Sequence, residues 1–335
     1  TQVNVVENFM LSYRDIINKI EQLEEANILL SALELNIFSA LEKSSMSVKQ
    51  VTSITKTKFE GTEVLLNALA AMGALTKNKN VYKNTPVTYK YFCETSSDFK
   101  KGTVMLKMDS RGEYDDLFKI VKSGRDFKKF EGGDDPKFRE LFTYAMHERS
   151  ELYAEKVADA VTQKKVGKLI DLGCGPGSYS AAILKRDKAV TATLMDRAAA
   201  IKVARKIHKN QAIYNRLKFV SGDLFGDEFG VGYDTVLLSN IIHIYNAKEN
   251  KTLFKKINKA LVNGGRILLY DFFLKDSRIA PYDAALFDIT MLLYTKTGKS
   301  YTFSEVDALV RNTGFARIKK TKIGYGSSII EAIKV

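Results

Sequence analysis

The stretch from Lys168 to Ser178, Lys-Leu-Ile-Asp-Leu-Gly-Cys-Gly-Pro-Gly-Ser, constrains the fold of this chain more than any other segment. An apolar run that contains Asp171 is followed by glycines at alternate positions, Gly173, Gly175 and Gly177. This pattern predicts a buried strand and then a turn whose backbone faces a ligand, because glycine tolerates positive φ and leaves room for close approach. The apolar run over 179–184 predicts a helix whose N-terminus points at that ligand.

The glycine spacing does not match a dinucleotide site. The pyrophosphate fingerprint is G-x-G-x-x-G/A, and here Ser178 occupies the last position while Gly177 comes one residue early. Asp171 at the end of the strand would also repel a pyrophosphate. We therefore expect a ligand with a cationic head, such as an amino acid that carries a sulfonium.

The second half of the chain alternates strand-like and helix-like segments, which is typical of a doubly wound, Rossmann-like α/β sheet. The predicted strands cover residues 168–172, 192–195, 217–220, 235–238, 266–270, 316–320 and 329–333. We assign residues 166–335 to this domain.

Residues 1–100 instead show a winged-helix pattern. Apolar residues recur at helical spacing over 28–37, Ser47 and Gln50 form a capping box, and a helix over 62–72 stops at Gly73. A polar turn at 77–80 between two short apolar runs predicts a β-hairpin wing. A winged helix often binds DNA, but the segment at the recognition position, 63–72, is nearly all apolar, which favours packing in a core or between subunits.

Residues 101–165 form the remaining segment, which we expect to be a helical linker. Its charged, helical composition differs from both neighbouring domains. We expect it to contribute to the pocket for the substrate.

Composition excludes several classes of protein. The net charge is +13, but the basic residues occur singly or in pairs, which argues against a nucleic-acid partner and is compatible with an acidic small substrate. Two cysteines give no disulfide framework, so we expect a reducing, cytoplasmic location. The two cysteines and the three histidines also lack the spacing of metal ligands, so we expect no metal site. No apolar run reaches the ~20 residues of a membrane span, and the polar N-terminus does not resemble a signal peptide.

Two further acidic residues follow predicted strands. Asp196 ends the second strand at the spacing of a carboxylate that accepts hydrogen bonds from ribose hydroxyls, and Asp223 ends the third, where it could accept from an adenine amino group. Each aspartate alone could simply cap the next helix. Three in series with the glycine turn favour a shared ligand.

These motifs resemble those of class I S-adenosylmethionine-dependent methyltransferases. The segments Ala-Leu-Glu-Leu-Asn-Ile-Phe at 32–38, Asp-Pro-Lys-Phe-Arg-Glu-Leu-Phe at 135–142 with Met146, and Ile-His-Ile-Tyr at 242–245 are similar to the caffeic acid and acetylserotonin type of O-methyltransferases and their bacterial relatives. The resemblance implies an N-terminal dimerisation domain, a homodimer, S-adenosylmethionine as cofactor and a small-molecule acceptor. No metal is implied.

The resemblance also implies roles for single residues. The glycines would pass beneath the methionine part of the cofactor, beside Asp171. Asp196 would hold the ribose, and Asp223 and Leu224 would hold the adenine. Ser239 would also contact the cofactor. The residues that would line the acceptor pocket are Met146, His147, Met291 and Thr295.

His243 is the candidate general base. It lies just past the fourth strand, and Asp271, which ends the fifth, matches the acidic partner that orients this histidine in the family. A phenol titrates near 10 and an imidazole near 6.5, so a neutral imidazole can assist removal of a phenolic proton during attack on the methyl group. The alternative for a lone histidine is a hydrogen-bonded structural role.

Two positions depart from the family pattern and leave the reaction open. Ile244 stands where plant members have an aspartate, and Ser300 stands where the family often has a glutamate. The chain could therefore methylate a hydroxyl with His243 as base, or it could transfer methyl to carbon, sulfur or nitrogen, for example on a tetrapyrrole or thiol, without strong base catalysis. A cofactor-binding regulator that uses the winged helix is the third hypothesis.

Overall fold

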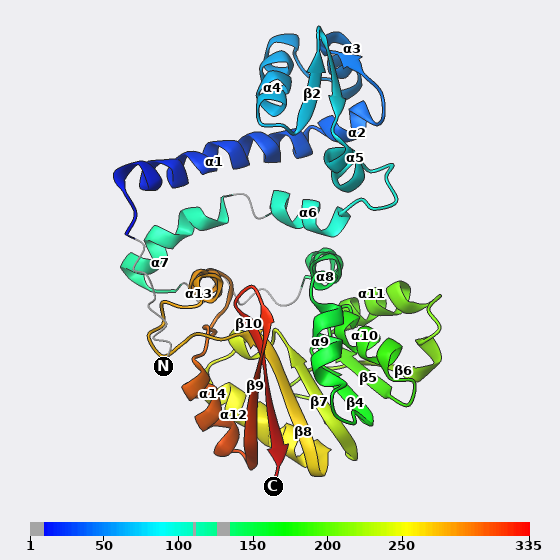
Figure 1. The fold of residues 1–335 in the computed structure, drawn as a ribbon, viewed down its shortest axis with the longest axis vertical. Helices are drawn as coiled ribbons and strands as arrows, with labels where there is room; N and C mark the ends of the chain where they lie inside the picture. Colours follow the sequence, from blue (N-terminus) through cyan, green and yellow to red (C-terminus); the bar gives the residue numbers. More distant parts are fainter. Residues whose placement is uncertain (1–9, 110–111, 126–134) are drawn as a thin grey trace, which may run out of the picture. The chain divides into compact units, whose positions relative to one another are not determined.

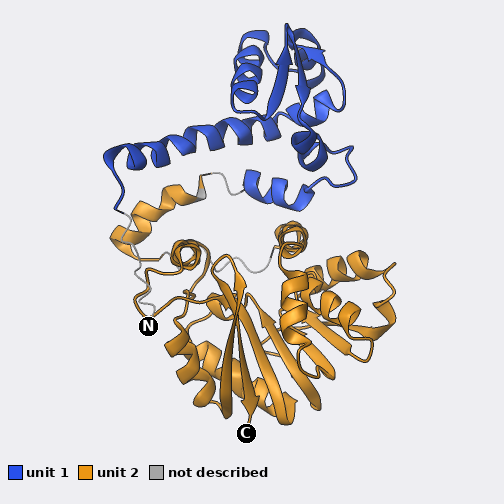
Figure 2. Cartoon of the chain, in the orientation of Figure 1, with its two compact units in different colours: residues 1–109 blue, residues 110–335 orange. Residues whose placement is uncertain are grey.

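The structure is a computed structural model and describes residues 10–109, 112–125 and 135–335. The chain divides into two compact units, residues 1–109 and 110–335, coloured separately in Figure 2. The boundary falls inside the segment 101–165, of which residues 110–111 and 126–134 lie outside the described part of the chain.

Unit 1 is a small helical domain with a three-stranded sheet, ordered β1-β3-β2. Its elements are α1 (Tyr13–Glu34), α2 (Ile37–Leu41), β1 (Met46–Ser47), α3 (Val48–Thr55), α4 (Phe59–Ala71), β2 (Leu75–Asn78), β3 (Val81–Asn84), α5 (Pro86–Phe92) and α6 (Lys101–Asp109). Its core consists of buried side chains from α1 to α4 and from the wing, among them Phe38, Leu66 and Tyr82. This arrangement confirms the predicted helical domain with a hairpin wing.

Local signals in unit 1 act as expected, although two boundaries differ. Ser47 caps α3, since its hydroxyl oxygen accepts from the Gln50 backbone N–H at 3.4 Å and Gln50 Oε1 accepts from the Ser47 N–H at 2.9 Å. Helix α4 begins at Phe59 rather than at 62. The wing turn is shorter than the predicted 77–80, because both strands pair up to Asn78 and Val81.

Unit 2 contains the seven-stranded sheet. Its helices are η1 (Glu113–Asp116), α7 (Leu117–Ser123), α8 (Pro136–Ser150), α9 (Ala154–Val161), α10 (Ser178–Arg186), α11 (Ala198–His208), η3 (Tyr214–Arg216), η4 (Ile242–Ile244), α12 (Ala247–Ala260), α13 (Tyr282–Tyr294) and α14 (Phe303–Arg311). Its strands are β4 (Lys168–Leu172), β5 (Thr191–Asp196), β6 (Leu217–Ser221), β7 (Tyr233–Ser239), β8 (Leu261–Phe272), β9 (Phe315–Gly324) and β10 (Ser327–Lys334).

The sheet has the order β6-β5-β4-β7-β8-β10-β9, so the chain begins in the middle, winds to one edge and then crosses to the other (Figure 1). Strands β4 to β8 are parallel, and β10 runs antiparallel between β8 and β9. Each of the seven predicted strands is confirmed within a few residues. The register places the ends of β4, β5, β7 and β8 at one edge of the sheet, the site that open α/β sheets use for ligands.

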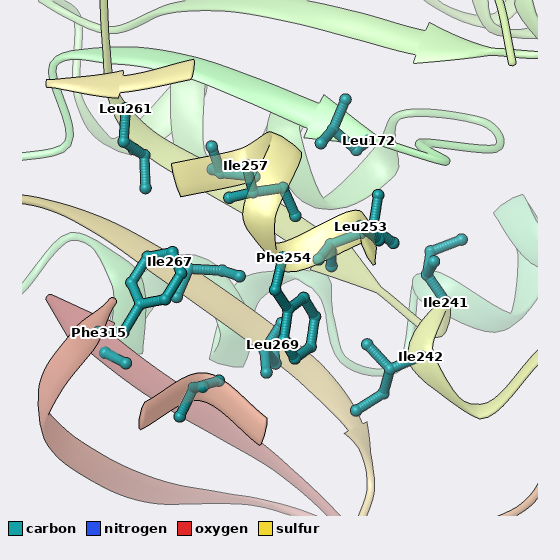
Figure 3. Close-up of a cluster of buried hydrophobic side chains, with 14 of the residues drawn as sticks. Leu172, Ile241, Ile242, Leu253, Phe254, Ile257, Leu261, Ile267, Leu269 and Phe315 are labelled. Atoms are coloured by element: carbon teal, nitrogen blue, oxygen red, sulfur yellow. The ribbon is translucent and has the colours of Figure 1, made fainter. Parts of the chain in front are cut away.

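Both faces of the sheet are covered because successive strand residues point to opposite sides. Ile170 and Val236 pack with α12 and α14 in one hydrophobic cluster, whereas their neighbours Leu169 and Leu237 pack with α9, α10 and α11 in another. Figure 3 shows the first cluster around Phe254 and Ile257 of α12. Among the described residues, no helix has the length and apolar character needed to cross a bilayer.

Phe254 anchors α12 on the sheet and is fully buried. We expect Phe254→Ala to lower the free energy of unfolding by about 3–5 kcal/mol, because the substitution removes a ring and leaves a cavity. Val231→Ala, at a side chain that is 72% exposed, serves as the control and should change stability by no more than about 0.5 kcal/mol. Urea titration of both variants measures this, and equal stabilities would contradict the central position of Phe254.

Candidate active site

The glycine turn between β4 and α10 is held by the end of β5. The backbone N–H groups of Gly173 and Cys174 donate to the Met195 carbonyl oxygen at 2.8 and 3.2 Å. The N–H of Gly175 donates to Asp196 Oδ2 at 2.7 Å. The turn is therefore fixed to the neighbouring strand.

The three glycines have positive φ angles of 69°, 52° and 69°, and their surroundings differ. A Cβ on Gly173 would lie 2.3 Å from Ile241 Cδ1, and one on Gly177 would lie 2.5 Å from Leu194 Cδ1. A Cβ on Gly175 would meet nothing within 4 Å. Gly173 and Gly177 are therefore required by packing, whereas Gly175 presents bare backbone to open space.

Asp171, at the end of β4, is a buried carboxylate with unused hydrogen-bonding capacity. Ser180 Oγ donates to Asp171 Oδ2 at 2.6 Å, while Asp171 Oδ1 has no partner among the described residues. Burial raises the pKa of Asp171 to about 7. A cationic group beside Oδ1 would offset this desolvation and favour the ionised carboxylate.

The other two aspartates make local hydrogen bonds as well. Asp196 Oδ1 accepts from the Arg197 N–H at 2.6 Å, in addition to the bond from Gly175. Asp223 Oδ1 accepts from the N–H groups of Phe225 and Gly226 at 2.8 and 2.7 Å, and Asp223 Oδ2 pairs with Arg197 Nη2 at 2.7 Å. Asp223 thus closes its own turn between β6 and β7, where the described chain forms no helix for it to cap.

Leu224 and Ser239 lie on the same side of the sheet as the glycine turn. A Leu224 methyl carbon would be 3.7 Å from a Cβ on Gly173. The hydroxyl of Ser239, the last residue of β7, is buried without a hydrogen-bond partner in the described part of the chain. An unsatisfied buried hydroxyl at a strand end is typical of a group that a ligand completes.

Two histidines support the turn from neighbouring helices. His147 Nδ1 and Ser178 Oγ share a hydrogen bond of 2.8 Å, which connects α8 to the first residue of α10. His208 Nε2, at the end of α11, lies 2.8 Å from the Pro176 carbonyl oxygen. No role could be predicted for His208, because its contact joins residues 32 positions apart.

The structure brings His243 and Asp271 together. His243 Nδ1 lies 2.7 Å from Asp271 Oδ1, and both side chains are almost fully buried. Because Asp271 accepts at Nδ1, the neutral ring carries its proton there and leaves the lone pair on Nε2, which has no partner in the described residues. The buried Asp271 Oδ2 has no partner either.

Two phenylalanines that the sequence reasoning missed line this position. The ring of Phe287 on α13 meets the His243 ring edge-on, with centroids 4.8 Å apart and planes at 85°. Phe272 is the residue after Asp271, and the centroid of its ring lies 4.8 Å from that of the Phe287 ring. A signal was present, since Phe287 lies four residues before the pocket candidate Met291 and so shares one face of α13 with it.

The residues expected to line an acceptor pocket have different surroundings. Met291 is buried on α13, and Met146 is partly buried on α8. The Thr295 hydroxyl donates to the Met291 carbonyl oxygen at 2.6 Å and accepts from the Gly298 N–H at 3.0 Å, so it closes the end of α13.

The two departures from the family pattern are Ile244, which follows His243 in the chain, and Ser300. Ile244 packs against the hydrophobic cluster around α12. Ser300 is buried, its N–H donates to Asp288 Oδ1 at 2.7 Å, and its hydroxyl has no partner in the residues that are described. Neither side chain hydrogen-bonds to His243.

Comparison with known proteins agrees with this fold. The family model of the O-methyltransferase domain matches residues 111–316, more than half of the chain, and that of the O-methyltransferase dimerisation domain matches residues 21–92. The chain therefore belongs to the O-methyltransferase family. It is an S-adenosylmethionine-dependent methyltransferase.

Individual relatives cover nearly the whole chain. A 3-hydroxy-5-methyl-1-naphthoate 3-O-methyltransferase of Streptomyces sahachiroi is 25% identical over 307 residues, which is 88% of this chain and 87% of that protein. An L-tyrosine C(3)-methyltransferase of Streptomyces lavendulae is 25% identical over 307 residues, 85% of this chain and 82% of that one. The structure of human N-acetylserotonin methyltransferase in complex with S-adenosylmethionine shares the fold, with a TM-score of 0.83, 21% identity and coverage of 98% and 99% of the two chains.

The glycine turn offers a matched pair of substitutions. Gly173→Ala should lower the free energy of unfolding by about 2–4 kcal/mol, because a side chain there must adopt positive φ and displace Ile241. Gly175→Ala should cost only about 1 kcal/mol for the φ angle, yet weaken binding of S-adenosylhomocysteine at least tenfold, because its methyl group enters the open space. Denaturation and calorimetry measure the two effects, and unchanged binding in Gly175→Ala would contradict the site.

Proposed function

We propose that this protein transfers a methyl group to a hydroxyl of a small aromatic molecule, with His243 as general base. The observation that carries the proposal is the hydrogen bond between His243 Nδ1 and Asp271, which leaves Nε2 unpartnered beside the Phe287 ring. A buried carboxylate on one ring nitrogen and a free second nitrogen are what a base at a strand end requires.

The residues of the glycine turn and of the strand ends fit the methyl donor, whose sulfonium supplies an activated methyl group when it is bound. Asp171 Oδ1 and the Ser239 hydroxyl are buried polar atoms without partners among the residues that the structure describes, as expected where a ligand completes the hydrogen bonding. We infer that Asp171 faces the donor's cationic amino-acid end and that Gly173, Gly175 and Gly177 lie beneath it.

We further infer that Asp196 holds the ribose and that Asp223 and Leu224 border the adenine. Each carboxylate oxygen can accept more than one hydrogen bond, so the bonds that Asp196 receives from Gly175 and Arg197 leave capacity for hydroxyl groups. The hydrogen bonds and the Arg197 pair that fix Asp223 leave the neighbouring Leu224 to cover the base by packing.

Base catalysis by His243 needs alignment and one proton transfer. The Asp271 carboxylate holds the ring in the tautomer with Nε2 unprotonated and stabilises the imidazolium that forms when Nε2 takes the acceptor's proton. Phe287 and Phe272 restrict the ring and exclude water on one side. The neighbouring Met146, His147, Met291 and Thr295 are the residues that we assign to the acceptor's surroundings.

Transfer to carbon is the second candidate, because the relative from Streptomyces lavendulae is a C(3)-methyltransferase of L-tyrosine. Serine at position 300, where the family often has a glutamate, fits either an easily deprotonated hydroxyl or transfer to carbon, sulfur or nitrogen. A DNA-binding regulator has weaker support, since only the winged-helix pattern favours it.

The base role predicts a selective loss of turnover. His243→Ala should lower kcat by about a hundredfold or more, because general base catalysis contributes 10²–10⁴-fold. Affinity for S-adenosylhomocysteine should stay within about threefold, since the histidine lies at the acceptor side. Asp271→Asn, which preserves shape but offers an NH₂ group to Nδ1, should lower kcat by about tenfold or more.

The measurement combines steady-state kinetics with mass spectrometry of the product. A methyl group on oxygen together with the loss in His243→Ala supports the proposal. Full turnover in His243→Ala would show that alignment without base catalysis drives the reaction. A product methylated on carbon would refute transfer to a hydroxyl.

We also propose that the protein forms a homodimer through unit 1. The dimerisation-domain match covers residues 21–92, and α1 exposes apolar side chains at alternating spacings of three and four residues. These side chains are Tyr13, Ile16, Ile20 and Leu23, which share one face of the helix. Such a stripe would be costly to leave in water and suits burial against a second copy.

Charge placed on this stripe should separate the subunits. The double variant Ile20→Glu with Leu23→Glu is expected to halve the molar mass measured by light scattering, because two carboxylates would lose hydration at the interface. Gln22→Glu, an exposed position on the opposite side of α1, is the control and should stay dimeric. A wild-type monomer would refute the proposal.

A further inference from the structure

Arg149, in the last turn of α8, presents an uncompensated positive charge beside the proposed active site. Its guanidinium lies over the ring of Phe272, 5.5 Å from the ring centroid. No carboxylate in the described part of the chain pairs with it. By contrast, Arg197 and Arg266 pair with carboxylates, and Arg216 donates to a backbone carbonyl oxygen. The side chain is solvent-exposed and therefore accessible to a ligand.

A continuous series of ring contacts joins Arg149 to the candidate base. Phe272 lies against Phe287 with ring centroids 4.8 Å apart, and Phe287 meets His243 at the same distance. These four side chains belong to unit 2 and form one wall with the imidazole at one end and the guanidinium at the other. An aromatic molecule along this wall would have one edge at His243 and the other near Arg149.

The glycine-turn side of Arg149 is also aromatic. Burial raises the pKa of the Tyr179 and Tyr270 hydroxyls, and the nearby Arg149 charge opposes that shift in both. Tyr179 is the second residue of α10, and its ring packs edge-on against Tyr270 with centroids 5.1 Å apart. The ring of Phe272 supports the guanidinium and leaves its N–H groups available to an anion.

We propose that Arg149 recognises a carboxylate on the acceptor, so that the substrate class is an aromatic carboxylic acid with its hydroxyl at the far end from the acid group. This inference rests on the proposed function and deepens it. A planar guanidinium held on a ring is preorganised for two parallel hydrogen bonds to a carboxylate, and an ester cannot replace that charge. The net charge of +13 would also draw such anions to the protein.

The test compares acids with their esters. The probes are 6-hydroxy-2-naphthoate and the shorter 4-hydroxybenzoate, each with its methyl ester, titrated into the full-length protein saturated with S-adenosylhomocysteine. Arg149→Gln should weaken binding of an acid by about 10–100-fold, the range for a hydrogen bond to a charged group. Binding of the ester should change less than threefold. Arg149→Lys should retain part of the preference, because it keeps the charge without the planar fork.

Arg205→Gln is the matched control. Arg205 also lies over a ring, 4.8 Å from the centroid of Phe219, but on α11 at the far edge of the sheet. Its substitution should leave the preference for acids unchanged.

The methyl donor carries a carboxylate too, so affinity for S-adenosylhomocysteine is measured in the same variants. An Arg149→Gln protein that loses this affinity while treating acid and ester alike would assign Arg149 to the donor and overturn the proposal. Equal weakening of acid and ester, or no binding of either acid to the wild-type protein, would also overturn it. Because binding is measured without turnover, the result is independent of whether His243 acts as base.

Discussion

The attachment of the glycine turn to β5 is the constraint on which the rest of the site depends. The Met195 carbonyl and the Asp196 carboxylate accept three backbone N–H groups from the turn, and His208 contacts the Pro176 carbonyl from α11. These bonds satisfy a backbone that cannot form regular secondary structure. The open side of Gly175 is thereby kept at the carboxyl edge of the sheet, next to the ends of β4 and β7.

The two halves of the proposed chemistry come from different parts of this edge. The donor side is built from β4, β5 and β7, whose parallel register places Asp196 and Ser239 two residues beyond Asp171 at the same edge of the sheet. The acceptor side is built from His243 and Asp271 with the rings of α13. The loop after α13 packs so closely on the histidine that a Cβ on Gly298 would lie 2.1 Å from the His243 carbonyl oxygen. Arg125 holds the same loop, since its Nη2 donates to the Gly298 carbonyl at 2.7 Å.

Much of the fold could be predicted because its signals are local. The strand over 168–172 was predicted to the residue, and the capping box at Ser47 places the start of α3. The wing turn is shorter than the sequence predicts, because pairing between β2 and β3 extends both strands over polar residues that look like a turn. Helix α4 begins at Phe59, three residues before its predicted start. At the site, the pairing of His243 with Asp271 was implied by the resemblance to the methyltransferase family, and His243 Nδ1 lies 2.7 Å from Asp271 Oδ1 in the structure. The Arg197 partner of Asp223 and the Arg149 contact with Phe272 had no counterpart in the spacing of residues.

The sequence by itself determined the class of fold, the position of the glycine turn and the order of acidic strand ends, because glycine conformation and hydrophobic periodicity act over a few residues. Only the tertiary structure decided which aspartate oxygens remain without partners, which rings surround His243 and which arginine stays unpaired. Those properties arise from packing between helices and strands that are distant in the chain, where the identity of a side chain does not specify its neighbours.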